Sequence, residues 1–566
     1  MKKNNFVIAL IFLFASTLLN AQSHNEEVTI EGSYTPHIKK SERLIRTPEM
    51  PKREFNIPNY SVNTKDFFYN YKVELEPISP LQYNYDKEEE ITNNFIKAGI
   101  GTRLSPEFLF RHYSDLSKKT SLGIGVTHNS TWLNMKDYAN SKYMNNAFNV
   151  SMSNRFSGFQ LHSRIDYHYD MYHLNNDTLY FGNNTNLNES RRSLHSLNVN
   201  LLANNNQTSY KSLYDEFALD YSYSGIQGGI QENLLKFKAH LEHSNSWFRK
   251  SSGIQTLAID VNADIDNVSQ SLFLIAANPY LAFDGEYYNL HLGFRVDAKT
   301  NSTSKGGIYP DIKGSLYLFE RNIEFYAGIS GKTRINTLKE ILEENPFVVA
   351  NPLNYAEFDY EKTHFDFQGG LKFKVMNHVS GHVGVRYRII DNKVFYVSSL
   401  TQPNVFDIIL NNCYVFNFKA DLHVKINDEI KVVGDFAYNN YDFIKARMTT
   451  DVPVTIAHAW YMPKVEFTLR GVYKYNQNWN FNIATYFEGK RYALTGQTEY
   501  ANEYDYNGIK ELKPFADIQL GCDYNFNKDI TFYAELKNLV HNKYQMYYGY
   551  PSYGFQAFLG FKYRFL

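Results

Sequence analysis

The feature that most constrains this chain is a strand pattern that repeats from about Asn94 to the C-terminal end. Segments of roughly ten to fifteen residues alternate apolar and polar side chains and then stop at a polar break. In one clear case, Phe365 and Phe367 flank Asp366, and Gln368 follows. Because successive side chains of a strand point to opposite sides of its sheet, each segment predicts a strand with one apolar and one polar or charged face.

The charged second face favours a transmembrane barrel over a soluble fold. A soluble sandwich packs one face of each sheet against the other sheet, so it would not keep charges on the second face of nearly every strand. A barrel instead turns its apolar face to lipid and its polar face to a wet lumen. The composition agrees, because 46 Tyr and 42 Phe occur although the mean hydropathy is negative. After residue 21 no apolar stretch is long enough to predict a membrane-spanning helix.

The number and spacing of the segments predict the architecture. We count about 22 segments, within about two strands of error. They begin near residues 94, 106, 119, 144, 159, 191, 211, 229, 253, 271, 286, 306, 321, 364, 378, 410, 428, 462, 478, 510, 529 and 555. Short breaks follow the even-numbered segments and long breaks follow the odd-numbered ones, as in barrels with short periplasmic turns and long external loops. We therefore predict an all-β fold, a transmembrane antiparallel β-barrel over residues 94–566.

Residues 1–21 have the order of a secretory signal. Lys2 and Lys3 precede an apolar run over residues 6–19, and Asn20-Ala21 closes it. The run is short for a membrane-spanning helix, which disfavours the alternative of a retained anchor, and no Cys follows it to accept a lipid. We expect cleavage near Gln22, export, and a location in a Gram-negative outer membrane.

Residues 22–93 predict an extended segment. They contain six of the sixteen prolines of the chain, which argues against a helix or a central strand. Two interpretations stay open: a flexible periplasmic tail, or a segment that fills the lumen or docks a periplasmic or lipoprotein partner. A barrel of about 22 strands is roughly 45 Å wide. This segment, inward-folded loops or a separate protein must therefore narrow it.

The chain ends in a strand with an aromatic face. Phe561, Tyr563 and Phe565 share that face, which is the pattern that barrel-insertion machinery reads, although Leu566 follows. Just before this strand, residues 535–544 read Glu-Leu-Lys-Asn-Leu-Val-His-Asn-Lys-Tyr. This stretch resembles the C-terminal end of TonB-dependent receptor barrels, and the strand count is similar to theirs.

The resemblance implies an outer-membrane receptor fold without the usual N-terminal plug domain. Receptors of this type carry a plug domain of more than a hundred residues, and only 72 lie in the segment 22–93. The resemblance therefore implies a plug-less relative, of the kind common in Bacteroidetes-like envelopes. Residues 27–32, Glu-Val-Thr-Ile-Glu-Gly, loosely resemble a TonB box. TonB coupling stays open.

The alternation assigns a set of polar side chains to the lumen. These candidates are Lys372, Lys374, Arg386, Arg388, Asn417, Lys419, Asp421, His423, Lys425, His162, Arg164, Asp166 and His168. The cations would bias a pore toward anions. Equally, they would pair with acids such as Asp366, Asp421, Glu466 and Asp517.

No cofactor, metal or enzyme site is expected. Same-face neighbours on a strand lie about 6.6 Å apart, so the residues of the set 162–168 could share a metal only with help from other strands. The segment 175–191 lacks the ordered carboxylates of a calcium loop. No nucleophile elbow, phosphate-binding loop or paired-cysteine motif occurs. A net charge of −1 gives no reason to expect nucleic acid. Cys413 and Cys522 fall on opposite faces, which disfavours a disulfide.

Three functions fit these observations. The first is a pore or transporter for a solute. The alternative is a sealed barrel that acts as a scaffold in an envelope biogenesis or secretion complex, and the third is an energised receptor that takes its plug from another protein. Residues 338–345 add a short helical pattern inside a long external loop. This helix could cap the mouth or fold inward.

Overall fold

The computed structural model describes the chain from residue 93 to residue 565, apart from several loop segments. The described residues are 93–135, 140–175, 191–205, 213–245, 254–268, 271–300, 306–350, 359–443, 455, 457–495 and 508–565. Among them, no helix combines the length and the apolar character needed to cross a membrane. The predicted signal segment 1–21 and residues 22–92 lie outside the described residues, so their predicted roles stay predictions.

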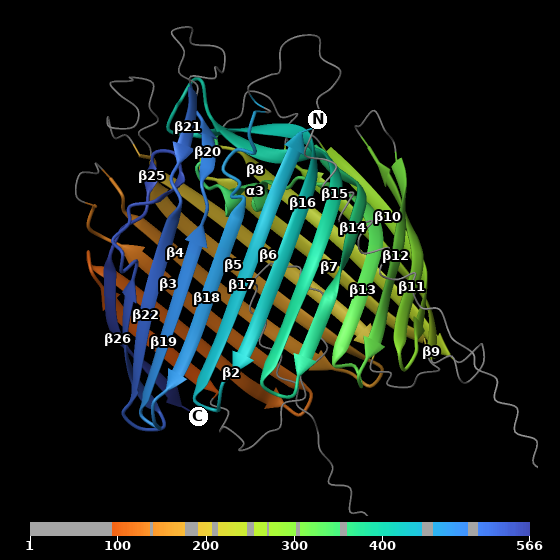
Figure 1. Cartoon of the computed structure of the whole chain (residues 1–566), viewed down its shortest axis with the longest axis horizontal. Coiled ribbons are helices and arrows are strands. Elements are labelled where there is room, and N and C mark those ends of the chain that lie inside the picture. Colours follow the sequence, from red (N-terminus) through yellow and green to blue (C-terminus); the bar gives the residue numbers. More distant parts are fainter. Residues whose placement is uncertain are drawn as a thin grey trace, which may run out of the picture. The chain divides into compact units, whose positions relative to one another are not determined.

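The wall is one closed antiparallel sheet of 22 strands (Figure 1). Its strands are β1 (Asn94–Gly101), β2 (Ser105–Ser117), β3 (Thr120–Thr131), β4 (Tyr143–Arg155), β5 (Phe159–His173), β6 (Arg191–Asn205), β7 (Leu213–Ile226), β8 (Gln231–Asn245), β9 (Ile254–Asn267), β10 (Ser271–Asp284), β11 (Tyr288–Lys299), β12 (Gly306–Leu318), β13 (Ile323–Ile335), β14 (Tyr360–Val375), β15 (Val379–Ser398), β16 (Phe406–Lys425), β17 (Ile430–Phe443), β18 (Val465–Lys474), β19 (Trp479–Glu488), β22 (Phe515–Asn525), β23 (Ile530–Lys537) and β26 (Gln556–Phe565). Each pairs with the next, and β26 pairs with β1. The prediction of an all-β barrel of about 22 strands is confirmed.

Two short hairpins lie outside this wall. β20 (Arg491–Leu494) pairs with β21 (Ile509–Leu512), and β24 (Gln545–Tyr547) pairs with β25 (Tyr550–Pro551). Both hairpins belong to connections between wall strands at the same end of the barrel. The sequence pattern predicted only long breaks there.

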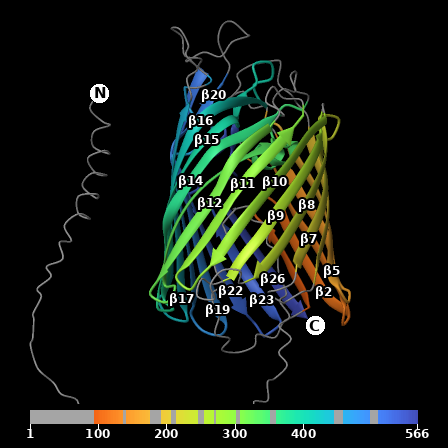
Figure 2. The ribbon, with the colours of Figure 1, turned by 90° about the vertical axis from the view of Figure 1, so that its right-hand side faces the viewer.

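The connections differ at the two ends of the barrel (Figure 2). At one end they are turns such as 118–119, 285–287 and 376–378. At the other end the connection between β13 and β14 runs over residues 336–359 and contains the helix α3 (Leu338–Glu344). We call these the short-turn end and the long-loop end. The predicted alternation of short and long breaks holds from β10 to β26. It does not hold throughout before β10, because the connections 227–230 after β7 and 268–270 after β9 are shorter than the connection 246–253 after β8.

The two faces of the wall differ as the alternation requires. On β14, Phe365 and Phe367 are 41% and 43% exposed on the outer face, whereas Asp366 between them is only 7% exposed. On β15, Val385 and Tyr387 are exposed and the intervening Arg386 bonds to Asp366. A continuous exposed apolar surface of this kind requires a nonpolar solvent. The outer face is therefore suited to lipid.

β15 and β16 extend beyond the alternating pattern. The sequence predicted a long break over 390–409, but the two strands stay paired up to Ser398 and Phe406. The register shifts between Ile390 and Lys393, and Asn392 there has a φ of +57°. Beyond this bulge the side chains on both faces are buried. The alternation is lost because this part of the hairpin packs against other parts of the protein and not against lipid.

Candidate functional site

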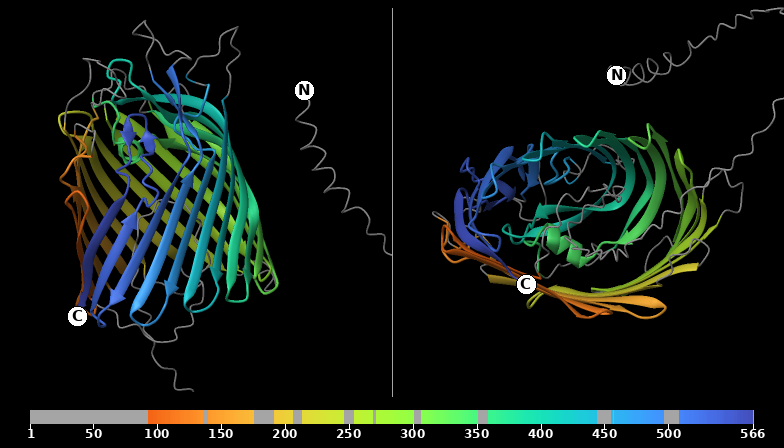
Figure 3. Two further views of the ribbon diagram at one scale, coloured as in Figure 1. Left: turned by 60° about the vertical axis from the view of Figure 1, so that its left-hand side comes forward. Right: turned by 90° about the horizontal axis from the view of Figure 1, so that it is seen from below.

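The helix α3 folds inward and lies within the ring of strands, not above it (Figure 3). The Thr337 side chain caps its N-terminus by accepting from the backbone N–H of Glu340. The backbone N–H groups of Leu338 and Lys339 donate to the carboxylate of Glu232, which belongs to the inner face of β8. A carboxylate at this position satisfies donors that the first helical turn leaves open. Of the two predicted positions for this helix, the inward one is correct.

An apolar core surrounds α3 at the long-loop end of the lumen. We call it the mouth cluster. Its buried members are Ile226, Ile230, Leu338, Ile341, Leu342, Val348, Ile390, Val394, Phe395, Tyr396, Val397, Phe406, Ile408, Cys413, Val415, Trp460, Tyr461, Ala493, Leu494 and Leu512. They come from the β7–β8 connection, the β13–β14 connection with α3, the extended β15–β16 hairpin, the segment 457–462 and the β20–β21 hairpin. Segments from five inter-strand connections thus share one dry core.

Aromatic contacts tie further segments to the mouth cluster. The Phe347 ring stacks on Tyr550 with 3.7 Å between ring centroids. Phe406 meets the edge of Tyr461 at 5.6 Å, and Tyr461 lies 5.1 Å from Tyr547. Such pairs add roughly 0.5–1.5 kcal/mol each to the burial of their surfaces. The β24–β25 hairpin is therefore held inside the mouth.

A buried ion pair fixes the same hairpin. The Arg491 and Glu488 side chains are 1% and 2% exposed, and Nε lies 2.6 Å from Oε1. The Arg491 guanidinium also donates to the backbone carbonyls of Gln545 and Met546, both at 2.7 Å. One cation thus joins the end of β19 to β24. A paired and hydrogen-bonded charge of this kind tolerates burial.

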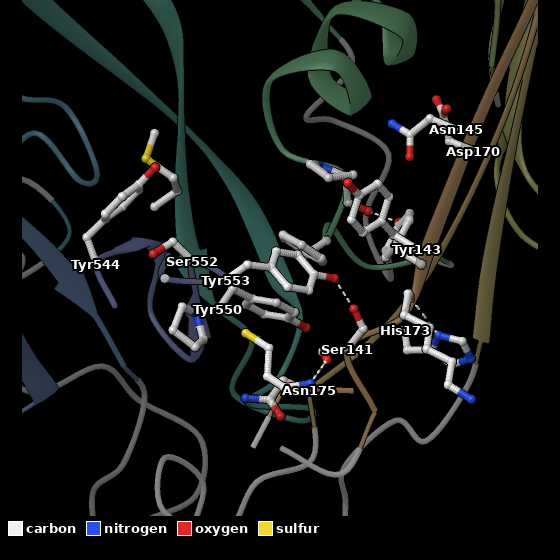
Figure 4. A pocket seen from close by; sticks show the side chains of 18 of the residues that line it. Ser141, Tyr143, Asn145, Asp170, His173, Asn175, Tyr544, Tyr550, Ser552 and Tyr553 are labelled. Carbon is white, nitrogen blue, oxygen red and sulfur yellow. Dashed lines mark hydrogen bonds between the residues drawn. The ribbon is translucent and has the colours of Figure 1, made fainter. Parts of the chain in front are cut away.

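A cavity of about 810 Å³ lies between the mouth cluster and the wall (Figure 4). Its lining combines aromatic rings, side-chain amides and a few charges, and it includes Tyr143, Tyr172, Phe347, Tyr544, Tyr550, Tyr553, Asn140, Asn145, Asn175, Gln519, Gln556, Asp170, His173 and Lys537. Wall strands β4, β5, β22, β23 and β26 supply one side, and the segment 538–555 supplies much of the other. The cavity lies at the long-loop ends of these strands.

Hydrogen bonds give the lining a defined shape. The Tyr553 hydroxyl donates to the backbone carbonyl of Ser141, and the Tyr544 hydroxyl donates to Asp517 at 2.9 Å. Burial raises the pKa of both phenols, and Asp517 raises that of Tyr544 further. Both therefore stay protonated donors. Within the described residues, the buried amide nitrogen of Gln556 and the amide oxygen of Asn140 have no hydrogen-bond partner. These two atoms can bind a polar ligand.

The predicted lumen residues of β14–β16 lie on the inner face, and several of them form pairs. Arg386 forms a bidentate pair with Asp366, and Lys372 lies 3.4 Å from Glu324. The remaining contacts join Lys425 with Asp428, Asp421 with His382 and with His423, and Arg388 with Asn417. The interpretation that lumen charges pair with one another therefore holds for three of the six predicted lysines and arginines of these strands, and for Asp421 with its two histidines.

Three predicted cations differ from the rest. Arg388 donates to the neutral Asn417 amide and forms no ion pair with a described residue. Lys374 and Lys419 form no ion pair with any residue that the structure describes. Lys419 is exposed to the lumen on β16. Any electrostatic bias of the lumen wall toward anions depends on side chains of this kind.

The predicted set on β5 also lies on the inner face. Arg164 and Asp166 form a bidentate pair with a closest distance of 2.7 Å. His162 and His168 lie on the same face, opposite the exposed Ile165 and therefore toward the lumen. No group of three or more possible metal ligands occurs among the described residues. The set follows one strand and does not converge on a site.

The predicted insertion signal lies on β26. Phe561 and Tyr563 are 43% and 37% exposed on the outer face, and the Tyr563 and Phe565 rings stack at 5.0 Å. Recognition by the insertion machinery stays a prediction.

The alternation of apolar and polar residues did not predict the mouth cluster or the cavity. One sequence signal could have found them. Residues 544–553, which belong to a predicted external loop, contain five tyrosines, at positions 544, 547, 548, 550 and 553. A loop that is surrounded by water rarely contains so many large aromatic side chains. Aromatic residues concentrated between strands therefore indicate a loop that folds into the lumen.

Comparison with known proteins places the barrel among receptor structures. No protein-family model and no curated protein sequence matches the chain. Solved structures do match: the ferric-catecholate import receptor Fiu from E. coli K12 (TM-score 0.61, 10% identity, 84% of this chain and 82% of that one) and the siderophore receptor PiuA from Acinetobacter baumannii (TM-score 0.60, 11% identity, 84% and 82%). The FpvAI–pyocin S2 complex is similar as well (TM-score 0.60, 11% identity, 85% and 74%). At such low identity the likeness concerns the fold, so this chain has the barrel fold of these receptors.

Proposed function

We propose that the chain is an outer-membrane barrel that takes up a solute, with the long-loop end facing outward and the cavity as the first binding site. One observation carries the proposal. The connections at the long-loop end fold into the lumen and leave a defined cavity of about 810 Å³ between themselves and the wall. Pockets of roughly 300–1,000 Å³ are typical of small-molecule sites.

The apolar outer face supports the membrane location. Its exposed aromatic and aliphatic residues would favour aggregation in water and are stabilised in lipid. The receptor structures with the same fold support the transport function. The ligands of those receptors belong to those proteins, and the solute of this chain has to be identified separately.

The orientation is tested with inserted epitopes. One epitope is placed between Leu494 and Ile509 at the long-loop end, and another replaces Lys528 in a short turn. We expect the first to bind antibody on intact cells and the second to bind only after the outer membrane is permeabilised. The opposite result would reverse the proposed orientation.

The transport function is tested by conductance in planar bilayers. The purified barrel is compared with a variant in which residues 338–344 are replaced by a Gly/Ser linker. Because α3 anchors the mouth cluster through Glu232 and three buried side chains, we expect the replacement to open the lumen and raise the conductance severalfold. If neither protein conducts, the pore proposal fails and the sealed scaffold becomes the better explanation.

Residues 22–93 enter the proposal as the contact for a periplasmic, lipoprotein or energising partner. The sequence pattern of this segment supports that role. Co-purification in mild detergent tests it, with the full chain compared with a chain that lacks residues 22–92. A partner that is retained by both proteins would assign the contact to the barrel instead.

A further inference from the structure

A hollow of about 440 Å³ lies at the short-turn end, between the β2–β3 and β4–β5 turns. It is lined by Ser117, Lys119, Thr120, Asn154, Arg155, Phe156 and Ser157. Thr120 and Asn154 are direct partners in the β3–β4 register, and the backbone N–H of Arg155 donates to the carbonyl of Lys119 at 2.8 Å. These bonds join the two turns, so the hollow is part of the rigid wall and not a gap between mobile loops.

The hollow carries unpaired positive charge. Lys119, Arg155 and the neighbouring Lys118 are exposed, and none of them forms an ion pair with a described residue. The nearest acid in sequence, Asp115, accepts a hydrogen bond from the Tyr113 hydroxyl. The short turns 319–322 and 526–529 combine a cation with an acid, as in Glu320-Arg321 and Lys528-Asp529, and the turns 376–378 and 475–478 contain neither Lys, Arg nor an acid. Among the short turns described, only 118–119 consists of two adjacent lysines without an acid.

Hydroxyl groups complete the polar lining. The Ser117 Oγ accepts a bond from the backbone N–H of Lys119 at 3.2 Å, which leaves its proton available to an outside acceptor. Thr120 and Ser157 add two further hydroxyls. Two cations with three hydroxyls form a donor-rich surface. Phosphate oxygens are the acceptors that best match such a set, because an arginine fork binds them in a bidentate manner.

Apolar side chains lie directly beside these donors. The Phe156 and Phe159 rings stack with 4.5 Å between centroids, and both are more than 40% exposed on the outer face. Leu116 is 61% exposed at the adjoining end of β2. Aromatic residues at barrel rims mark the boundary between headgroups and acyl chains. The surface is therefore amphipathic across a short distance, with donors at the rim and aromatic rings toward the membrane.

We propose that this hollow binds the headgroup phosphate of an anionic phospholipid, whose acyl chains lie against Phe156 and Phe159. The proposal rests on the membrane location given under the proposed function. Lys119 and Arg155 contact the phosphate, Lys118 adds a longer-range attraction, and the hydroxyls of Ser117, Thr120 and Ser157 donate to the remaining oxygens. Basic sites at the membrane boundary of other proteins recognise anionic headgroups by the same physics.

The test measures lipid binding to the full chain in a nonionic detergent. Native mass spectrometry is used with dihexanoylphosphatidylglycerol and with the zwitterionic dihexanoylphosphatidylcholine. We expect the anionic lipid to bind more tightly, and the variant K118Q/K119Q/R155Q to lose roughly a hundredfold in affinity for it, since each cation near an anionic headgroup contributes about a factor of five. The variant K431Q/K474Q/K528Q removes three charges near other short turns and should bind like the wild type.

Two further arms make the outcome decisive. The variant F156S/F159S should weaken binding of the lipid and leave competition by inorganic phosphate unchanged. Two results together would show a simple anion site and contradict the lipid proposal. Inorganic phosphate would bind the hollow as tightly as the anionic lipid does, and F156S/F159S would bind that lipid as tightly as the wild type. The proposal would also be contradicted if K118Q/K119Q/R155Q and K431Q/K474Q/K528Q lost the same affinity for the anionic lipid. A barrel that fails to conduct but keeps this selectivity refutes only the transport function, and a conducting barrel without selectivity refutes only the lipid site.

Discussion

The outer face of the wall and the mouth cluster use the same residue types in opposite ways. On the wall, Phe367 is 43% exposed, and its partner on β15, Tyr387, is exposed as well. In the mouth cluster, Phe406 and Trp460 have no exposed surface. The wall is held by its ladder of backbone bonds, and its side chains gain free energy from contact with lipid. The mouth cluster is stabilised as a soluble core is, by close packing. Equal substitutions should therefore cost different amounts in the two regions.

Arg491→Ala should give the largest effect. It leaves the Glu488 carboxylate buried without its cation and removes two donors from the carbonyls of β24. Breaking a buried ion pair typically costs about 3–5 kcal/mol. The measurement is guanidinium unfolding of the barrel in lipid vesicles, together with hydrogen exchange at residues 545–551. We expect exchange there to rise strongly.

The wall offers a matched ion pair as the control for this substitution. Arg386 pairs with Asp366 on the wet inner face, where the Arg386 side chain is 39% exposed. The Asp366 side chain is only 10% exposed, so Arg386→Ala should cost about 1–3 kcal/mol, which is less than the cost of breaking the fully buried pair. Equal costs for the two substitutions would show that the mouth is as wet as the lumen wall.

Phe406→Ala should come next in size. A buried Phe→Ala change costs about 3–5 kcal/mol, because the apolar surface is lost and a cavity remains. Phe367→Ala is the control on the outer face. Lipid chains fill the space there, so only the transfer cost of about 1.5–3 kcal/mol is expected. Vesicle-based unfolding measures both. A larger loss for Phe367→Ala would contradict the assignment of Phe406 to a dry core.

One part of the wall is itself packed like the mouth cluster. Tyr533, Gly560, Gly99 and Glu107 form a single row across β23, β26, β1 and β2, where the barrel closes. The Tyr533 ring lies over the two glycines, its hydroxyl donates to Glu107, and Lys97 lies 4.4 Å from the ring centroid. The row joins the first strands of the chain to the last.

Gly560→Val tests this closing row. A Cβ at Gly560 would overlap the Tyr533 hydroxyl and the carbonyl oxygen of Ala98. Overpacking of this kind costs about 1–3 kcal/mol. We expect the barrel to lose its folded mobility on SDS gels at a lower temperature than the wild type. Gly434→Val is the control, because the nearest atom to a Cβ there is 3.8 Å away. Unchanged heat resistance of Gly560→Val would mean that the row does not support closure.

The sequence predicted the wall well because its physics is local. A strand between lipid and water must alternate, so the register can be read from one strand at a time. The predicted starts at 364, 410 and 510 missed the observed Tyr360, Phe406 and Phe515 by four or five residues. All three starts lie at the long-loop end, where Tyr360, Phe406 and Phe515 are buried and the alternation no longer applies.

The mouth cluster and the cavity could not be predicted in the same way. Their contacts join residues far apart in the chain, such as Tyr172 with Pro346 and Arg192 with Val348. No periodicity within one segment encodes such a pairing. The short helix 338–344 was visible as a local pattern, but its inward position depends on Glu232, about a hundred residues earlier. The sequence therefore indicated the element and left its location open.

Lys419→Gln should give the smallest effect, and it measures what a charge on the inner face contributes to ion selectivity. Lys419 is exposed to the lumen and forms no ion pair with a described residue, whereas Arg386 is neutralised by Asp366. At physiological salt the field of one charge decays over about 8 Å. We therefore expect a change of less than about twofold in the anion-to-cation permeability ratio for Lys419→Gln, given the width of the lumen. The reversal potential in a salt gradient measures this ratio. Arg386→Gln should also shift the permeability ratio toward cations, but by less, because Asp366 already compensates that charge in the wild type. A larger shift for Arg386→Gln than for Lys419→Gln would show that the conducting path passes next to the paired residues of β14 and β15.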